Sequence, residues 1–358
     1  MSSILSVTRA LAVAVAVAAV ALLQPTGAGA ATRTPDALLL DSYQPVLVFH
    51  PSEPFRPAKV QSFIEHSVLE RFVGTSVAQL PYDPYWTVVD ADPEPGELPP
   101  PTPGAFYRLN ESTCEPDAAL AGRDCYADAA SVGGGGAAVY GRVARTDSYV
   151  VLQYWLFYYD NPLVLPATPF GSFWQSHEGD WELVNVVLSA SEQPLAAAYS
   201  QHCSGQTMAW AGVQKSPPAS THPVAYVALG SHANYFAAGA GPLGEVAINP
   251  SCVPGAVRQA LPALPFLHVT DQVVDGSAVG AVVGPPASGV QPATIHPIDG
   301  TAWSSFGGRW GESEYFYTPI PIGPVPGGTA LPVGLAPASP AYHTTWNIDS
   351  VLDWPAAP

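Results

Sequence analysis

Residues 176–182 read Ser-His-Glu-Gly-Asp-Trp-Glu and run directly into the apolar sequence Leu-Val-Asn-Val-Val-Leu at 183–188. This pattern predicts a turn that enters a strand. Alternate side chains of a strand share a face, so Asp180 and Glu182 are expected on one face, which the apolar residues continue into the core. Their Cα atoms would lie about 7 Å apart. Carboxylates at this spacing repel each other unless a proton or a cation lies between them.

A metal site is one interpretation of this pair, with His177 as a third ligand. The alternative is an acidic strand end in solvent. The rest of the sequence has to decide between them.

The composition favours a mainly β fold. The chain has 358 residues, of which 40 are Pro and 32 are Gly, and this many prolines would interrupt long helices. Short apolar runs between turn signals predict a β-sandwich with long proline-rich loops and few short helices. A helix is expected at 59–72, where apolar residues recur at helical spacing. Little regular structure is expected at 81–103, which is rich in proline.

The N-terminus has the pattern of an export signal. One basic residue, Arg9, precedes an apolar run that ends at Leu23, and small residues follow up to residue 31. The apolar run is shorter than the roughly 20 residues that span a bilayer. We therefore expect a signal peptide at 1–30, a secreted, extracellular protein without a transmembrane span after cleavage, and one β-sandwich domain at 31–358. Its core motifs would occupy 43–236 and a C-terminal extension 251–358.

Charge and cysteine content fit this location. The formal net charge of −17 argues against nucleic acid as a partner, because the phosphate backbone attracts basic proteins. An even number of cysteines in an exported chain favours structural disulfides. Of three possible pairings we expect the local one, Cys114 with Cys125 and Cys203 with Cys252.

Histidines and carboxylates recur at the predicted strand ends: Asp160, His177, Asp180, Glu182, His202 and His232. Strands that lie side by side would bring these ends to one edge of a sheet. Oxygen ligands dominate among Asp160, His177, Asp180 and Glu182, so Ca²⁺ or Mg²⁺ is expected there rather than Zn²⁺. His202, His232 and Asn234 would line the site.

Several blocks of the chain resemble the vacuolar protein sorting-associated protein 62 family. They are 43–57, 154–161, 177–182, 199–205 and 225–235, with 308–311 as a further match. A sorting role, which the name of that family implies, does not suit an exported chain.

The central motif is also similar, more distantly, to the Gly-His-Arg-His-Asp-Trp-Glu motif of the necrosis- and ethylene-inducing-like proteins. These are secreted cytolysins with a β-sandwich, in which a divalent cation takes part in binding sphingolipid sugar headgroups. The resemblance implies cation ligands at Asp160, His177, Asp180 and Glu182. The chain departs from the motif at Ser176, Glu178 and Gly179.

Three functions follow as hypotheses. The first is a secreted protein that uses a divalent cation to bind a sugar or lipid headgroup, with membrane perturbation as a further expectation; Trp174 or Trp210 would stack on a sugar. The second is a metal-dependent hydrolase with His202 or His232 as acid or base. The third is a sorting or structural adaptor without a small-molecule site, in which the carboxylates diverge.

Overall fold

The computed structural model describes residues 33–75, 83–111, 136–164, 174–202, 204–217, 219–238, 271, 273–274, 279–318 and 329–357. The expected signal peptide and all four cysteines lie outside the described residues. In the part of the chain that is described, no helix combines the length and the apolar character needed to cross a bilayer.

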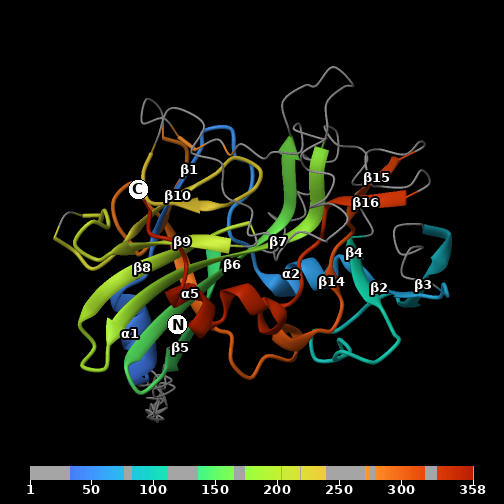
Figure 1. The fold of residues 1–358 in the computed structure, drawn as a ribbon, viewed down its shortest axis with the longest axis horizontal. Coiled ribbons are helices and arrows are strands. Elements are labelled where there is room, and N and C mark those ends of the chain that lie inside the picture. Colours follow the sequence, from blue (N-terminus) through green and yellow to red (C-terminus); the bar gives the residue numbers. More distant parts are fainter. Residues whose placement is uncertain are drawn as a thin grey trace, which may run out of the picture.

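Strands dominate the fold (Figure 1), and the largest sheet has the strand order β11-β10-β1-β12-β13-β5-β6-β7-β8-β9. In chain order these strands are β1 (Val46–Phe49), β5 (Ala137–Arg145), β6 (Tyr149–Val164), β7 (Trp174–Ser189), β8 (Pro194–Gln201), β9 (Ser204–Ala209), β10 (Val224–Val227), β11 (Asn234–Tyr235), β12 (Val282–Gly284) and β13 (Gln291–Pro297). The mainly β fold that the sequence predicts is confirmed.

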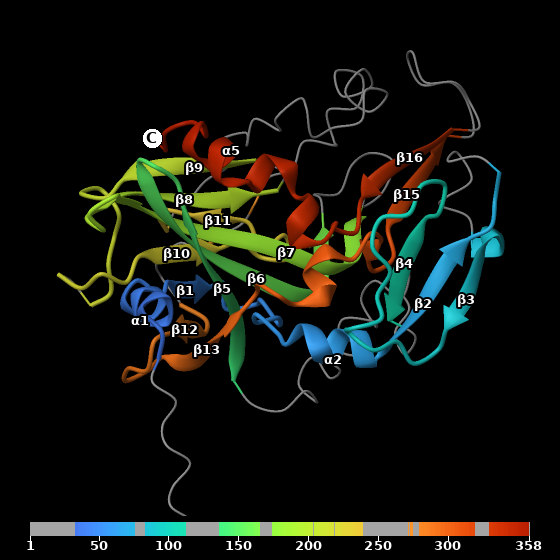
Figure 2. The same cartoon turned by 90° about the horizontal axis from the view of Figure 1, so that it is seen from below.

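Two central strands of this sheet come from the last third of the chain. β12 pairs with β1, and β13 runs parallel to β5. β11, at one end of the strand order, lies in contact with β8, which is next to the other end. The sheet is therefore nearly closed, and Figure 2 shows β11 beside β8. The antiparallel pair β6 and β7, with sixteen residues in each strand, forms its longest part.

Two smaller sheets and a few short helices complete the described fold. One is a four-stranded sheet with the order β14-β4-β2-β3, and Figure 2 shows its strands β4, β2 and β3 at one end of the molecule. Its strands are β2 (Ser67–Phe72), β3 (Trp86–Asp90), β4 (Tyr107–Glu111) and β14 (Arg309–Trp310), and a separate pair consists of β15 (Glu314–Thr318) and β16 (Thr329–Gly334). The α-helices are α1 (Pro35–Ser42), α2 (Val60–Glu65) and α5 (Ile348–Leu352).

Two local expectations were wrong in part. The helix expected at 59–72 ends at Glu65, and β2 follows at once. Along β2, Ser67 and Leu69 are buried whereas Val68 and Glu70 are less so, which is the two-residue period of a strand. Pairing with β3 and β4 thus overrides the apolar spacing. The second case is β3 itself, which lies in a stretch where little regular structure was expected.

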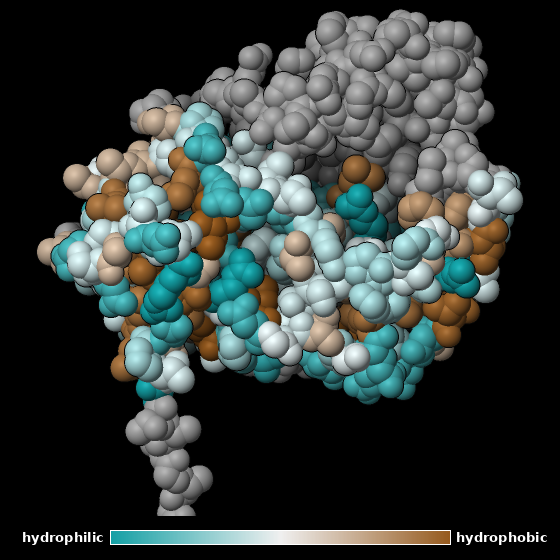
Figure 3. Space-filling view, turned by 60° about the horizontal axis from the view of Figure 1, so that its bottom comes forward, coloured by the Kyte–Doolittle hydropathy of each residue, from teal (hydrophilic) through white to brown (hydrophobic). Residues whose placement is uncertain are grey.

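Aromatic side chains of β6 and β7 fill the core. Trp155 and Trp181 are buried. The ring of Trp181 lies 4.9 Å from that of Phe157 and stacks on Trp303 at 5.7 Å. On the face shown in Figure 3, small hydrophilic and hydrophobic areas alternate over the coloured residues.

Candidate functional site

The central motif lies inside β7 rather than in a turn before it. β7 begins at Trp174, and Gly179 interrupts the regular strand with a φ of +58°. Glycine adopts this conformation without the steric cost that a side chain brings. A Cβ at this position would also lie 2.1 Å from the carbonyl oxygen of Trp310. Gly179 therefore combines a left-handed backbone with a close approach to the backbone of Trp310 in β14.

Glu178 and Asp180 contact different parts of the molecule, although regular alternation would place them on one face. Glu178 accepts hydrogen bonds from the backbone N–H groups of Glu111 at 3.1 Å and Glu312 at 2.9 Å. Asp180 instead accepts from the side chain of Asn161 at 3.3 Å. The break at Gly179 thus separates a structural carboxylate from the pair expected in the site.

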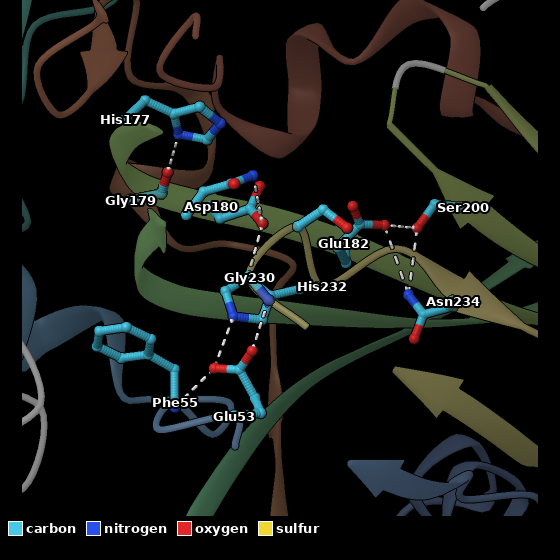
Figure 4. Close-up of polar contacts among 12 residues, drawn as sticks. Glu53, Phe55, His177, Gly179, Asp180, Glu182, Ser200, Gly230, His232 and Asn234 are labelled. Carbon is cyan, nitrogen blue, oxygen red and sulfur yellow. Dashed lines mark hydrogen bonds and ion pairs between the residues drawn. The ribbon is translucent and has the colours of Figure 1, made fainter. Parts of the chain in front are cut away.

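Asp180 forms a buried ion pair with His232. The Nδ1 atom of His232 lies 3.0 Å from Oδ2 of Asp180, and its Nε2 atom lies 3.4 Å from Oε1 of Glu53. Figure 4 shows the imidazole between these two carboxylates. Glu53 is fixed in turn by the backbone N–H groups of Phe55 at 2.8 Å and Gly230 at 2.7 Å.

The surroundings of His232 favour its charged form. Burial by itself lowers the pKa of His232, but Glu53 and Asp180 outweigh burial and raise it to about 9. The ring stacks on Tyr158, with centroids 3.8 Å apart and planes 2° apart. His232 has a φ of +54°, which is uncommon for a residue with a side chain. These contacts hold an imidazolium in the acidic cluster.

Glu182 differs from Asp180 in having neutral partners. The hydroxyl of Ser200 and the amide of Asn234 donate to its Oε2 atom, the latter at 3.4 Å. Among the described residues, no cationic side chain forms an ion pair with it. Burial and the nearby charge of Asp180 raise the pKa of Glu182 well above its ordinary value. Within the described residues Glu182 is thus a buried carboxylate without a cationic partner, and its surroundings favour the protonated form.

His177 lies at the more open end of this row. The exposed fraction is 2% for Glu182, 5% for Asp180 and 9% for His177, so all three side chains are buried. The Nδ1 atom of His177 lies 2.7 Å from the carbonyl oxygen of Gly179, which makes Nδ1 the donor and leaves Nε2 as the basic nitrogen. Burial lowers the pKa of His177 and favours the neutral ring.

The remaining predicted residues lie around this row. Asn234 contacts Glu182 directly, as described above. Asp160 is buried, and it is the residue of β6 that pairs with Glu178 of β7. The Nε2 atom of His202 contacts Asp271 at 3.0 Å rather than Asp180 or Glu182.

The described residues do not form a ready metal-ligand set. No three His, Cys, Asp or Glu side chains within the described ranges gather closely enough to hold a metal ion. The cation that contacts Asp180 here is the ring of His232. A site formed by Asp160, His177, Asp180 and Glu182 stays a prediction, and so does Ca²⁺ or Mg²⁺ as its cation.

Sequence reasoning did not single out Glu53, Asn161, Ser200 or Asp271. Glu53, Asn161 and Ser200 lie within the blocks that carry the family resemblance, but no role was assigned to them. Asp271 lies in a stretch without a strand signal, and only the folded chain brings it to His202.

Comparisons with known proteins give limited information. No family model and no curated protein matches the chain. Solved structures that match include the protein NLPPya in complex with glucosamine, at 25% identity and a TM-score of 0.21, over 29% of this chain and 46% of that chain. A structure described as a toxin fold for microbial attack and plant defense matches at 19% identity and a TM-score of 0.28, over 57% and 70%.

A third match is the necrosis and ethylene inducing protein 2 from the causal agent of cocoa's Witches Broom disease. It has 24% identity and a TM-score of 0.21, over 28% of this chain and 45% of that chain. The chain thus spans about half the length of the first matching structures. These neighbours are proteins of the toxin fold that the motif resembles, whereas the resemblance to the vacuolar protein sorting-associated protein 62 family stays a prediction. Because these structural matches are weak, the candidate site is inferred from its own contacts alone.

Proposed function

We propose that this protein binds a polar ligand and that Asp180 and Glu182 receive a positive charge that comes with it. The observation that carries the proposal is Glu182, a buried carboxylate with neutral hydrogen-bond partners and no ion pair among the described residues. The ionised form of such a carboxylate is costly to bury unless it is paired, which is why burial raises the pKa of Glu182. A bound cation would supply the missing partner.

Unused acceptors around the carboxylates support the same class of ligand. The amide groups of Asn161 and Asn234 donate to Asp180 and Glu182, which fixes their orientation. Their Oδ1 atoms are buried and accept no hydrogen bond within the described part of the chain. A ligand rich in N–H or O–H donors would satisfy these oxygens.

Two sources of the positive charge fit this chemistry. One is a divalent cation, Ca²⁺ or Mg²⁺, that also binds the hydroxyl groups of a sugar or of a lipid headgroup. The other is an ammonium group of the ligand itself. Both place positive charge beside oxygen acceptors, and an experiment separates them. Secretion and a perturbing action on membranes belong to the same proposal.

The histidine contacts speak against the hydrolase alternative. A general base needs a free lone pair near neutral pH. Both ring nitrogens of His232 face carboxylates, and Asp271 raises the pKa of His202, which favours its protonated form. The adaptor alternative expects the carboxylates to diverge, whereas Asp180 acts electrostatically on Glu182. Binding of a polar ligand agrees better with both observations.

A thermal-shift series tests the proposal, because a ligand that binds only the folded state raises the Tm. Chelator-treated protein is heated with CaCl2, MgCl2, glucosamine or glucose, and with each salt together with glucose. A shift with glucosamine alone identifies an ammonium ligand. A shift with a divalent salt, larger when glucose is present, identifies a cation-assisted site. If neither an amine nor a divalent cation shifts the Tm, the proposal is wrong.

A further inference from the structure

A second polar cluster centres on the buried carboxylate of Asp271. Its Oδ2 atom lies 3.0 Å from Nε2 of His202 and accepts a hydrogen bond from the hydroxyl of Tyr235. Its Oδ1 atom accepts from the hydroxyl of Ser231. One carboxylate thus receives three side-chain donors, and it is 2% exposed.

Two of these three donors, His202 and Tyr235, lie at strands near opposite ends of the strand order of the large sheet. His202 directly follows β8, and Tyr235 belongs to β11. The side-chain amide of Gln201 also donates to the carbonyl oxygen of Asn234 at 3.1 Å. Asp271 therefore spans the line along which β8 and β11 meet and the sheet nearly closes.

The residues that follow Asp271 in the described chain are anchored on the same side. Val273 and Val274 are buried in a small apolar cluster with residues of β1, β10 and β11. The carboxylate is consequently held in place by packing as well as by hydrogen bonds. The carboxylate of Asp271 can therefore hold the end of β8 and β11 together through its contacts with His202 and Tyr235.

We propose that Asp271 is a latch that closes the seam between β8 and β11, and that the protonation of His202 controls it. His202 suits this role because its side chain is 21% exposed while its partner is buried. Solvent can therefore remove the proton from the ring, whereas the carboxylate stays inside.

The charged groups around the latch fix the direction of its pH response. Burial by itself lowers the pKa of His202, but Asp271 and the more distant Asp180 raise it above its ordinary value. Burial raises the pKa of Asp271, yet His202, Ser231 and Tyr235 outweigh this and lower it. The negative charge of Glu182 repels that of Asp271 and raises the pKa of Tyr235. The ion pair is therefore closed near neutral pH and weakens as pH rises through the raised pKa of His202.

The latch is connected to the candidate site through β11. Tyr235 of this two-residue strand donates to Asp271, and its neighbour Asn234 donates to Glu182. Opening of the seam would move Asn234 away from Glu182. Ligand affinity at Glu182 would then change. That effect rests on the proposed function, whereas the latch itself does not.

Hydrogen–deuterium exchange of the full chain from pH 6 to pH 9, corrected for intrinsic exchange rates, tests the latch. In the wild type, protection of peptides from 196–202 and 231–238 should fall as pH rises. In His202→Gln it should be low already at pH 6 and change less with pH. Tyr235→Phe keeps the ion pair and should keep the pH response. His222→Gln, which removes a half-buried histidine near Gln44, is the control and should behave as the wild type.

Retention of wild-type protection and pH response by His202→Gln would overturn the latch. Both proteins contain His232, so its own titration contributes equally to the two pH responses. Near-UV circular dichroism verifies that each variant is folded. In a second arm, glucosamine and CaCl2 are titrated into both proteins. If neither binds the wild type, the proposed function fails, while the exchange data still decide on the latch.

Discussion

The rings of His232 and Tyr158 lie parallel, with centroids 3.8 Å apart and planes 2° apart. The tyrosine face stabilises the imidazolium by a cation–π contact, which is worth about 2 kcal/mol when it is desolvated. The hydroxyl of Tyr158, by contrast, is buried and has no hydrogen-bond partner in the described part of the chain. The ring and the hydroxyl should therefore differ in their effects on stability.

Replacement of Tyr158 separates these two effects. Tyr158→Phe keeps the stack and removes the unsatisfied hydroxyl, so the free energy of unfolding should stay the same or rise by about 1 kcal/mol. Tyr158→Leu removes the stack and leaves a cavity, and should cost about 2 kcal/mol or more. Urea unfolding at pH 7 measures both. A loss of more than about 1 kcal/mol in Tyr158→Phe would mean that the hydroxyl has a partner in the folded protein.

The raised pKa of His232 predicts that stability declines in mildly alkaline solution. The shift from 6.5 to about 9 corresponds to about 3 kcal/mol. Because the folded pKa is the higher one, this contribution is complete below pH 6.5 and is lost as pH rises to about 9. Urea unfolding at several pH values between 6 and 10 should show the decline. In His232→Gln the slope over this range should be smaller, and an unchanged slope would contradict the assignment.

Gly179 should tolerate a side chain less well than a glycine with a similar backbone. A Cβ at Gly179 would meet the carbonyl oxygen of Trp310, whereas one at Gly289, with a φ of +74°, would meet nothing within 4 Å. Gly289→Ala should cost about 1 kcal/mol, from the left-handed conformation alone. Gly179→Ala adds a clash with backbone and should cost about 2 kcal/mol more. Equal losses in the free energy of unfolding, measured with denaturant, would contradict this and show that the backbone at Trp310 shifts at little cost.

Glu182 should show the opposite pH behaviour to a carboxylate in a salt bridge. Its folded pKa lies above the unfolded one. As pH rises above about 4.5 the unfolded chain loses this proton while the folded state keeps it, so the free energy of unfolding falls. Glu182→Gln has no such ionisation and should be at least as stable as the wild type at pH 7. The measurement is the Tm of both proteins at pH 5 and pH 7. A Tm of Glu182→Gln well below that of the wild type at pH 7 would mean that the ionised carboxylate has a stabilising partner.

Local sequence pattern was sufficient for the strands that carry the motif. β5, β6, β7 and β8 follow from apolar and aromatic runs with turn residues between them. β12 and β13 could not be predicted in this way, because their partners β1 and β5 lie far away in the sequence. The helix at 59–72 failed for the same reason, since pairing with β4 decided the structure after Glu65.

The candidate site was predictable only in part. The motif identified Asp180 and Glu182, and the structure brings His232 to Asp180 and Asn234 to Glu182. A site-lining role for His232 and Asn234 stays a prediction. The sequence could not indicate that His232 lies between Asp180 and Glu53, because Glu53 belongs to a proline-rich turn far from β7. Nor did alternation along a strand predict the different direction of Glu178, which depends on the backbone at Gly179.

Calorimetric titration of chelator-treated protein with CaCl2 and, separately, with glucosamine tests the central claim most directly, with the wild type and Glu182→Gln side by side. The claim is that Glu182 receives a positive charge from the ligand. It predicts one binding site in the wild type for at least one of these probes, and an affinity at least tenfold weaker in the folded Glu182→Gln variant. Equal affinities in the two proteins, or no binding of either probe to the wild type, would contradict it.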